Sequence, residues 1–399
     1  MKTRPVMQGS RSLPHPLTTV RARRTGDKAG LSPLSFALCL FTALALAACE
    51  PTSVIEDLGT LGGPSMGLGI NAAGNVTGGS YLSNTDPHTA GLHAFRYVDG
   101  LGMIDVGALP TGNISEGQGI NSGGRIVGGS LVGVDDSVSH AFVASATLVL
   151  TDLGTLGGDY SYAWDINDNG QITGEAANKA GDVHAFLWTS AGGMRDLGTL
   201  GGNQSVGRSI NESGQVAGEN RIGTVVTRAF RFTEGVGMVS LGTLPGGTRS
   251  SGYGINDSGQ VVGESDNGPI LNPTLLLKGF SLFGTHAFLW TESVGMTDLG
   301  HLGGGSSTAL AINNNGMVVG TSTLVNGTSR AFRWTQAEGM IDIDTLLPRS
   351  SGWVLLVAYD VNDRGQITGL GVHNGAQRAF RLNPPSIVES KADARSTSG

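Results

Sequence analysis

Histidine recurs at one position of a repeated Ala-Phe motif, where an imidazole could ligate a metal ion or act as a general base. The motif occurs seven times, preceded by four histidines and three arginines: His93, His140, His184, Arg228, His286, Arg330 and Arg378. Metal ligands must converge to within about 2 Å of one ion, whereas a residue that occurs once per repeat is spread through the fold. Arginine also offers no lone pair to a metal. We therefore interpret this position as a hydrogen-bond donor at the start of a strand.

Glutamates that end the preceding strand are the expected partners of this donor across a hairpin. The expected pairs are Glu175 with His184, Glu219 with Arg228 and Glu264 with His286. Cross-strand pairs of opposite charge contribute about 0.2–1 kcal/mol each. These residues are thus predicted to stabilise the fold.

Aspartate recurs once per repeat as well, in a run that resembles Asp-Leu-Gly-Thr-Leu. The aspartates are Asp57, Asp105, Asp152, Asp196, Asp298 and Asp342, and Ser240 replaces them in one copy. Two carboxylates perform acid–base chemistry together only when they flank the same bond, and one carboxylate per repeat does not provide that. We predict a turn or strand-edge role, in which the charge also discourages edge-to-edge aggregation.

The stretch from Asp165 to Gly170 resembles the start of a calcium-binding loop. Such a loop needs a glutamate at its twelfth position, which is Ala176 here. No nucleophile–base pair or phosphate-binding loop is evident either. The sequence therefore predicts no catalytic, cofactor-binding or metal-binding residue, and no cofactor.

These residues belong to a unit that occurs seven times between residues 54 and 382. An asparagine marks each copy, with spacings of 50, 46, 44, 45, 57 and 49 residues: Asn71, Asn121, Asn167, Asn211, Asn256, Asn313 and Asn362. Glycine follows each asparagine after three and after seven residues, with Val or Ile between. Asn-x-x-Gly is typical of a tight turn between two strands. The residue four before each asparagine is Gly or Ala, which predicts close approach of backbones.

Four short strands per repeat are typical of a β-propeller blade. The third strand opens with Ala-Phe, and the fourth is the Asp-Leu-Gly run. We predict an all-β fold, a seven-bladed β-propeller of four-stranded blades. The first run, Val54–Leu61, resembles a fourth strand, and the last copy stops after a third strand at Leu382. The N-terminal strand is therefore expected to close the ring by pairing with the last blade. A β-solenoid, or a six- or eight-bladed ring, is the alternative.

Tryptophan follows the repeated phenylalanine by two residues in three copies: Trp188, Trp290 and Trp334. Residues two apart lie on the same face of a strand. We interpret these side chains as part of a core between blades. A sugar-stacking surface is the alternative.

The N-terminal residues 1–48 are predicted to be a signal peptide. They contain a basic region and an apolar run that is too short to span a membrane. The run ends in Leu-Ala-Ala-Cys, which resembles the lipobox of bacterial lipoproteins, so Cys49 is the expected lipidation site. Ordinary cleavage near Ala48 is the alternative. Residues 49–53 would be a lipidated linker, 54–385 the propeller and 386–399 a disordered tail. The expected location is the outer membrane or cell surface.

The His-Ala-Phe copies, the Asn-x-x-Gly turns and the Asp-Leu-Gly-Thr-Leu runs together resemble the HAF-repeat family of extracellular proteins. The resemblance covers roughly residues 54–382. It implies secretion or surface display and carries no established activity, so it assigns no catalytic residue. This sequence departs from the family pattern in its three arginines and in Asp344, which replaces a glycine.

The charge balance excludes one class of partner. Residues 1–48 hold seven of the 25 basic and one of the 32 acidic residues, so their removal leaves 18 and 31, a net charge of −13. Such a chain repels phosphate backbones, and we expect no nucleic-acid partner. Membrane attachment would come from the lipid on Cys49.

One insertion is apolar on this otherwise polar protein, and it spans Pro269–Phe283. Exposed apolar patches often bind a partner, so we name six candidate contacts there: Leu271, Leu275, Leu276, Leu277, Phe280 and Phe283. The alternative is that the insertion folds back on its own blade.

These features favour a non-enzymatic surface lipoprotein, a binding, adhesion or scaffold module for a glycan, peptide or envelope partner. A polysaccharide-active or other hydrolytic enzyme with its site in the central funnel is the alternative, and a purely structural spacer is a third. An enzyme would place unmatched polar residues where the first strand of each blade meets the centre. The nearly uniform small residues at that place argue against an enzyme.

Overall fold

The computed structural model describes residues 53–84, 91–133, 138–223, 226–268 and 284–385, which all belong to the unit Cys49–Gly399. Within these ranges the chain is all-β, with strands β1–β28 and a single short 3₁₀ helix, η1 (Ile343–Leu346). The described residues include no helix with the length and apolarity that a membrane crossing requires.

The strands form seven antiparallel sets of four, which we number in chain order. Set 1 is β2 (Ser65–Ile70), β3 (Val76–Tyr81), β4 (Leu92–Val98) and β5 (Gly102–Gly107), and set 2 is β6 (Ser115–Ile120), β7 (Ile126–Val132), β8 (Val138–Ala144) and β9 (Leu150–Asp152). Set 3 is β10 (Gly157–Ile166), β11 (Ile172–Asn178), β12 (Val183–Thr189) and β13 (Gly193–Asp196), and set 4 is β14 (Gln204–Ile210), β15 (Val216–Ile222), β16 (Val226–Thr233) and β17 (Gly237–Ser240).

The remaining sets follow the same order. Set 5 is β18 (Ser250–Ile255), β19 (Val261–Asp266), β20 (Thr285–Thr291) and β21 (Gly295–Asp298), and set 6 is β22 (Gly303–Ile312), β23 (Val318–Leu324), β24 (Ser329–Thr335) and β25 (Gly339–Asp342). Set 7 is β26 (Trp353–Val361), β27 (Ile367–His373), β28 (Ala376–Asn383) and β1 (Val54–Asp57). Sets 3 and 4 are joined into one eight-stranded sheet by a single parallel pair, Val183 with Gln204.

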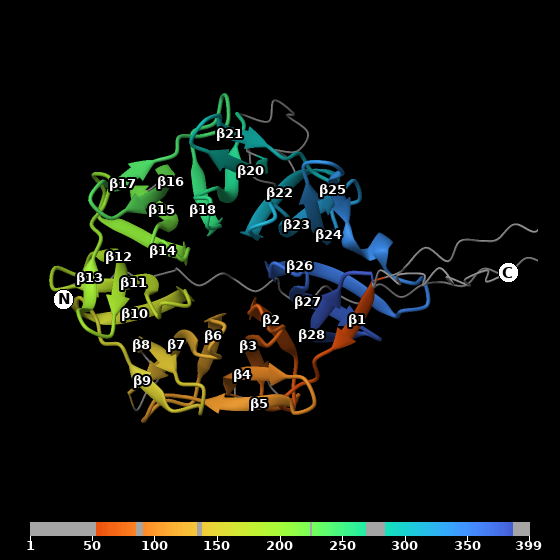
Figure 1. The fold of residues 1–399 in the computed structure, drawn as a ribbon, viewed down its shortest axis with the longest axis horizontal. Helices are drawn as coiled ribbons and strands as arrows, with labels where there is room; N and C mark the ends of the chain where they lie inside the picture. Colours follow the sequence, from red (N-terminus) through yellow and green to blue (C-terminus); the bar gives the residue numbers. More distant parts are fainter. Residues whose placement is uncertain (1–52, 85–90, 134–137, 224–225, 269–283, 386–399) are drawn as a thin grey trace, which may run out of the picture. The chain divides into compact units, whose positions relative to one another are not determined.

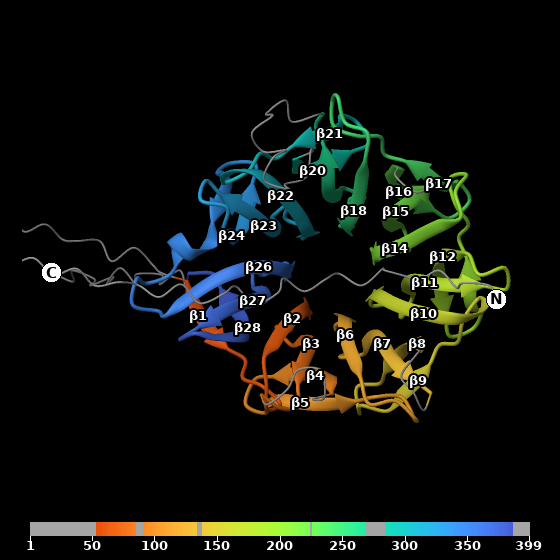
Figure 2. The ribbon, with the colours of Figure 1, turned by 180° about the vertical axis from the view of Figure 1, so that it is seen from behind.

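Set 7 takes its fourth strand from the start of the described chain. Strand β1 pairs antiparallel with β28, from Val54 opposite Asn383 to Asp57 opposite Phe380. Figure 1 shows β1 and β28 side by side, although they come from opposite ends of the sequence. In both Figures 1 and 2 the first strand of each set, such as β2, β14 or β26, lies nearest the common centre of this unit.

The Asn-x-x-Gly segments are tight turns, as predicted. In the first, the Gly74 N–H donates to the Asn71 carbonyl at 2.9 Å, and the Asn71 N–H donates to the Asn75 carbonyl at 3.0 Å. The seven turn glycines have positive φ values between 72° and 87°. Glycine adopts this backbone conformation without the steric cost that a Cβ atom brings.

The seven asparagines also join each set to the next. Each Nδ2 donates to the backbone carbonyl of the following asparagine, at 2.9–3.2 Å: Asn71 to Asn121, Asn121 to Asn167, Asn167 to Asn211, Asn211 to Asn256, Asn256 to Asn313, Asn313 to Asn362 and Asn362 to Asn71. These side chains are 3–6% exposed. Since buried amides need partners, the same residue is required in every copy.

A buried serine makes a second link between sets. Ser161 Oγ accepts from the Ala141 N–H at 2.8 Å and donates to the Gly154 carbonyl at 2.6 Å, both of set 2. Set 7 lacks this serine, and Asp344 replaces its function by accepting from the Leu355 N–H at 2.8 Å. The departure of Asp344 from the repeat pattern therefore has a structural reason.

The core lies between neighbouring sets. The phenylalanines of the Ala-Phe motif are fully buried in all seven copies, and burial of such a side chain stabilises a fold by about 1.5–3 kcal/mol. Trp188 packs against a cluster that contains Val127 of set 2 and Phe186 of set 3, and Trp290 and Trp334 occupy equivalent positions. The interpretation of these tryptophans as core residues is confirmed.

The small residue of each first strand lies against the second strand of the preceding set, which confirms the predicted close approach. A Cβ atom on Gly67 would lie 2.2 Å from Thr368 Oγ1, and one on Gly207 would lie 2.2 Å from Thr173 Oγ1. Ala163 packs in one cluster with Val127 of the preceding set. Gly67, Gly117 and Gly207 thus face threonine, and alanine faces valine, whereas Gly252 faces the backbone of Gly218.

Candidate functional site

The repeated histidines hydrogen-bond to the repeated aspartates of the same set. The Nδ1–Oδ distances are 2.7–2.9 Å for His93 with Asp105, His140 with Asp152, His184 with Asp196 and His286 with Asp298. The predicted glutamate pairs are therefore wrong. In the β11–β12 ladder Ala176 lies opposite His184, and Glu175 lies opposite Ala185. Because adjacent residues of a strand point to opposite faces, Glu175 lies on the other face.

The aspartates also have the predicted turn role. Asp57, Asp105, Asp152, Asp196 and Asp298 each accept from the backbone N–H of the glycine two residues later, at 2.7–2.9 Å. The arginines act as donors, as predicted: Arg330 Nε lies 3.2 Å from Asp344, and Arg228 donates to the Thr248 carbonyl. The His/Arg position therefore serves the scaffold.

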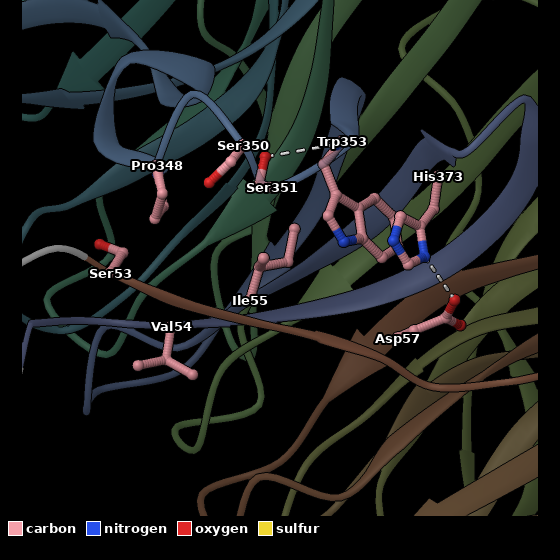
Figure 3. Close-up of a pocket in the computed structure, with 9 residues that line it drawn as sticks. All are labelled: Ser53, Val54, Ile55, Asp57, Pro348, Ser350, Ser351, Trp353 and His373. Atoms are coloured by element: carbon pink, nitrogen blue, oxygen red, sulfur yellow. Dashed lines mark hydrogen bonds and ion pairs between the residues drawn. The ribbon is translucent and has the colours of Figure 1, made fainter.

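A cleft of about 450 Å³ lies beside β1 in set 7, where the histidine comes from β27. His373 Nδ1 lies 2.9 Å from Asp57 Oδ2, and the ring stacks on Trp353 with centroids 4.5 Å apart. Figure 3 shows these side chains with Ser351 at the same cleft. Sequence reasoning missed His373 because it lies outside the Ala-Phe motif.

Serine, histidine and aspartate are the residue types of nucleophilic catalysis, but this cleft does not arrange them for it. The Ser351 Oγ accepts from the Trp353 N–H at 3.3 Å, and no hydrogen bond joins Ser351 to His373. The second ring nitrogen of His373 lies 3.1 Å from the Asn374 amide. The imidazole is therefore engaged on both nitrogens by other groups.

A second group of residues lies on the first and second strands of sets 2–5, near the centre of the unit (Figure 1). We call it the inner cluster: Glu116, Gln118, Tyr160, Tyr162, Trp164, Glu175, Arg208, Glu219, Tyr253 and Glu264. Its members occupy positions at which the repeats differ. Eight residues after the asparagine, sets 3–5 have glutamate, whereas the other sets have Gly79, Gly129, Thr321 and Leu370.

Arg208 lies at the centre of the inner cluster. Its Nη2 lies 2.7 Å from Glu219 Oε1, and both side chains are 14% exposed. The guanidinium carbon lies 4.1 Å from the Trp164 ring centroid and 6.0 Å from that of Tyr253. Its Nε and Nη1 atoms are buried and have no acceptor among the described residues. Buried donors of this kind are rare in folded proteins, so this side chain retains unused hydrogen-bonding capacity.

The other glutamates of the inner cluster accept hydrogen bonds from hydroxyl groups. Tyr160 donates to Glu175 at 3.0 Å, and Tyr253 donates to Glu264 at 3.1 Å. Tyr162 donates to Glu116 at 2.9 Å. Gln118 and Thr308 add two further donors, at 2.8 Å to Glu116 and 2.7 Å to Glu264. Among the described residues, Arg208 thus pairs directly with Glu219, whereas Glu116, Glu175 and Glu264 accept from neutral donors.

Two of these carboxyl groups are shifted in opposite directions. Burial raises the pKa of Glu175, and the opposing effects of Arg208 and Tyr160 do not cancel it. Burial also acts to raise the pKa of Glu219, but the charge and hydrogen bond of Arg208 outweigh it, and the net pKa is lowered. The direct 2.7 Å contact between Glu219 and Arg208 explains why the pKa of Glu219 is lowered.

Two partly buried aspartates link sets near the same centre. Asp165 accepts from Ser209 Oγ at 2.8 Å and from the Ile210 N–H at 2.9 Å, and burial raises its pKa to about 6. Asp360 accepts from the Ile70 N–H at 2.8 Å, and burial raises its pKa to about 7. The Asp165 carboxylate is thus occupied by protein donors, which gives the calcium-loop interpretation no support.

The expectation that the first strands carry only small residues near the centre is wrong. The residue four positions before each asparagine is small, as expected. The residue three positions before each asparagine varies, and in chain order it is Leu68, Gln118, Trp164, Arg208, Tyr253, Leu310 and Tyr359. This variation is visible when the repeats are aligned, and it is the signal by which the inner cluster could have been found from the sequence.

In the described part of the chain, no three His, Cys, Asp or Glu side chains gather as metal ligands. Cys49 and the six insertion residues, Leu271, Leu275, Leu276, Leu277, Phe280 and Phe283, lie outside the described residues.

Neither a protein-family model nor a curated protein sequence matches the chain. Among solved structures, the S511A mutant of puromycin hydrolase complexed with PGG is similar, with a TM-score of 0.50, 14% identity, and coverage of 80% of this chain and 52% of that chain. The β-propeller domain of the trilobed protease from Pyrococcus furiosus gives a TM-score of 0.47 and 8% identity, covering 84% and 96%. TolB from Acinetobacter baumannii gives a TM-score of 0.41 at 10% identity, with coverage of 61% of this chain and 53% of TolB.

These likenesses concern the fold alone, because the sequence identities are low. The chain spans about half the length of the first structures that it matches. The class that the fold defines is an all-β protein of four-stranded antiparallel sheets.

Proposed function

We propose that residues 54–385 form a closed seven-bladed β-propeller of the HAF-repeat type. Two observations support closure. Strand β1 pairs with β28, and the chain of asparagine hydrogen bonds returns from Asn362 to Asn71 at 2.9 Å. A solenoid has free ends and needs neither contact.

The protein is a non-enzymatic binding module for a glycan, peptide or envelope partner, and the inner cluster is its site. The observation that carries this proposal is the location of the departures from the repeat. Positions that hold the sets together are the same in nearly every copy, whereas Trp164 and Arg208 each occur in one copy only, and Arg208 contacts both Trp164 and Glu219. A buried ion pair contributes little to stability, and local departures from a regular pattern tend to mark functional sites.

A hydrolytic enzyme is the second candidate, and one observation favours it. In glycoside hydrolases the acid and the base are two carboxyl groups whose surroundings separate their pKa values. The pKa of Glu175 is raised and that of Glu219 is lowered beside the same Arg208. Turnover of a polysaccharide or ester that Glu175→Gln abolishes would replace the binding proposal with this one.

The binding proposal is tested with the full chain carrying Cys49→Ser. The purified chain is screened against immobilised glycans, peptides and envelope proteins, and the same screen is run on Arg208→Gln. We expect at least one ligand to be retained by the first chain and lost by the second. Retention of every ligand by both chains would contradict a site at the inner cluster.

The proposed location is the outer membrane or cell surface, with a lipid on Cys49 as the membrane contact. Metabolic labelling with a radioactive fatty acid is expected to label the chain, and Cys49→Ser is expected to remove the label and release the protein. Labelling that survives this substitution would contradict the proposed anchor.

A further inference from the structure

We propose that the inner cluster binds a neutral, hydroxyl-rich saccharide. This inference rests on the proposed binding function and names the ligand chemistry of the same site. Three features of the cluster support this inference. Its carboxylates accept hydrogen bonds from hydroxyl groups, the Arg208 guanidinium has donors without an acceptor among the described residues, and its net negative charge repels anions.

The carboxylates of the cluster already accept hydrogen bonds from hydroxyl groups. Glu175 accepts one hydrogen bond from Tyr160 at 3.0 Å, and Glu264 accepts two, from Tyr253 at 3.1 Å and from Thr308 at 2.7 Å. A carboxylate offers roughly four lone-pair sites, so Glu175 and Glu264 have capacity for further donors. The hydroxyl groups of a sugar supply such donors.

Arg208 supplies the complementary donors. Its Nε and Nη1 have no acceptor among the described residues, while its Nη2 is held by Glu219 at 2.7 Å. An unpaired buried donor costs about 1–3 kcal/mol. A hydroxyl both donates and accepts, so one diol can donate to a glutamate and accept from this guanidinium. Ligands that carry only donors, such as amines, would leave the arginine unsatisfied.

Aromatic side chains lie against these polar groups. Trp164 lies against Tyr162 with ring centroids 4.7 Å apart, and Tyr253 belongs to the same arc of first strands. At the equivalent position, sets 1 and 6 have the partly buried Leu68 and Leu310. Small-ligand sites are typically lined by apolar and aromatic groups with a few polar groups that fix orientation. A pyranose, with apolar C–H faces and a polar rim, fits this combination.

The charge of the cluster selects against acidic sugars. It contains the four carboxylates of Glu116, Glu175, Glu219 and Glu264 and the single guanidinium of Arg208, a formal charge of −3. Like charges across an interface are strongly unfavourable. Uronates and sulfated or phosphorylated sugars are therefore excluded, and neutral sugars are not.

The test measures binding at pH 7 by isothermal titration, with the full chain carrying Cys49→Ser. The probes are neutral oligosaccharides of glucose, mannose and N-acetylglucosamine, with oligogalacturonate as the anionic comparison. We expect a neutral oligosaccharide to bind and oligogalacturonate not to bind. Arg208→Gln and Glu264→Gln are each expected to weaken binding at least about tenfold.

The matched control is Glu292→Gln, because Glu292 is an exposed glutamate outside the cluster. It is expected to leave binding unchanged. Circular dichroism establishes that each variant is folded, and Glu264→Gln decides the outcome if Arg208→Gln does not fold. Preference for oligogalacturonate, or neutral-sugar binding that neither cluster variant weakens, would overturn the inference. Binding of peptides alone at Arg208 would also overturn it, while leaving the proposed binding function intact.

Discussion

The side-chain amide of Asn362 donates to the backbone carbonyl of Asn71 at 2.9 Å, although the two residues are 291 positions apart in the sequence. The other asparagines make the same bond to the next copy, 44–57 residues later. The contact between last and first copies is thus chemically identical to the contacts within the series. This equivalence leads to a direct test of closure.

Asn362→Ala is expected to lower the free energy of unfolding by about 1–3 kcal/mol, because it leaves the Asn71 carbonyl without its buried donor. Asn121→Ala, in the middle of the series, is the matched control and is expected to cost the same. Denaturant titration measures both. In an open array the last copy would have no following partner, so a near-zero cost at Asn362 alone would contradict closure.

Gly67→Ala is expected to destabilise the protein, because the added Cβ would lie 2.2 Å from Thr368 Oγ1. Sets with alanine at this position face valine, as Ala163 faces Val127 and Ala309 faces Val262. We therefore expect Thr368→Val to restore much of the lost stability in the double variant, with a coupling energy of about 0.5–3 kcal/mol.

A double-mutant cycle by chemical denaturation measures this coupling between sets 1 and 7. Gly67→Ala combined with Thr173→Val serves as the control pair, since Thr173 faces Gly207 instead. Additive effects in the Gly67–Thr368 cycle would show that the two residues are not in contact.

Arg381 joins three segments and is 5% exposed. Its guanidinium lies 2.6 Å from Glu56 of β1 and 2.7 Å from Asp99 after β4, and it donates to the Gly74 carbonyl at 2.6 Å. Arg381→Ala is expected to lower stability by about 1–3 kcal/mol. Arg195→Ala, which removes an exposed pair with Glu234, is expected to change stability by less than about 1 kcal/mol. Equal thermal shifts for the two variants would contradict this account.

Asp360 makes stability depend on pH. Its pKa is raised by burial from 3.8 to about 7, so the folded state holds a proton that the unfolded state releases at lower pH. Stability from this group is therefore fully present below about pH 4 and is lost as the pH rises to about 7. Asp360→Asn, which is always neutral, is expected to reduce this loss. Denaturation of both chains at pH 5 and pH 8 measures it, and an unchanged difference between the two pH values would refute the assignment.

Much of the architecture was predictable because the same residue recurs in every copy for the same physical reason. The turn glycines need a positive φ, and the Ala-Phe phenylalanines fill equivalent core positions. The partner of His184 was not predictable from proximity alone, because Glu175 and Ala176 differ in the face to which they point. Whether His184 pairs with Glu175 or with Asp196 depends on the register of β12 against its two neighbouring strands, β11 and β13.

The inner cluster could not be assembled from the sequence for a different reason. Trp164, Arg208 and Tyr253 are far apart in the chain and become neighbours only when the first strands of successive sets lie side by side. Comparison of the repeats reveals that these positions vary. The contact of Arg208 with both Glu219 and Trp164 requires the packing of sets 3 and 4.

The most direct test of the inner cluster as the binding site is an NMR titration of the Arg208 Nε–H and Trp164 indole N–H resonances, assigned with Arg208→Gln and Trp164→Phe. The ligand is the tightest-binding neutral oligosaccharide from the titrations above, added to the ¹⁵N-labelled chain. We predict that both resonances shift in proportion to occupancy, and that Arg208 shows the larger change because its Nε gains an acceptor. Saturation of the protein with ligand while both resonances stay in place would contradict the central claim.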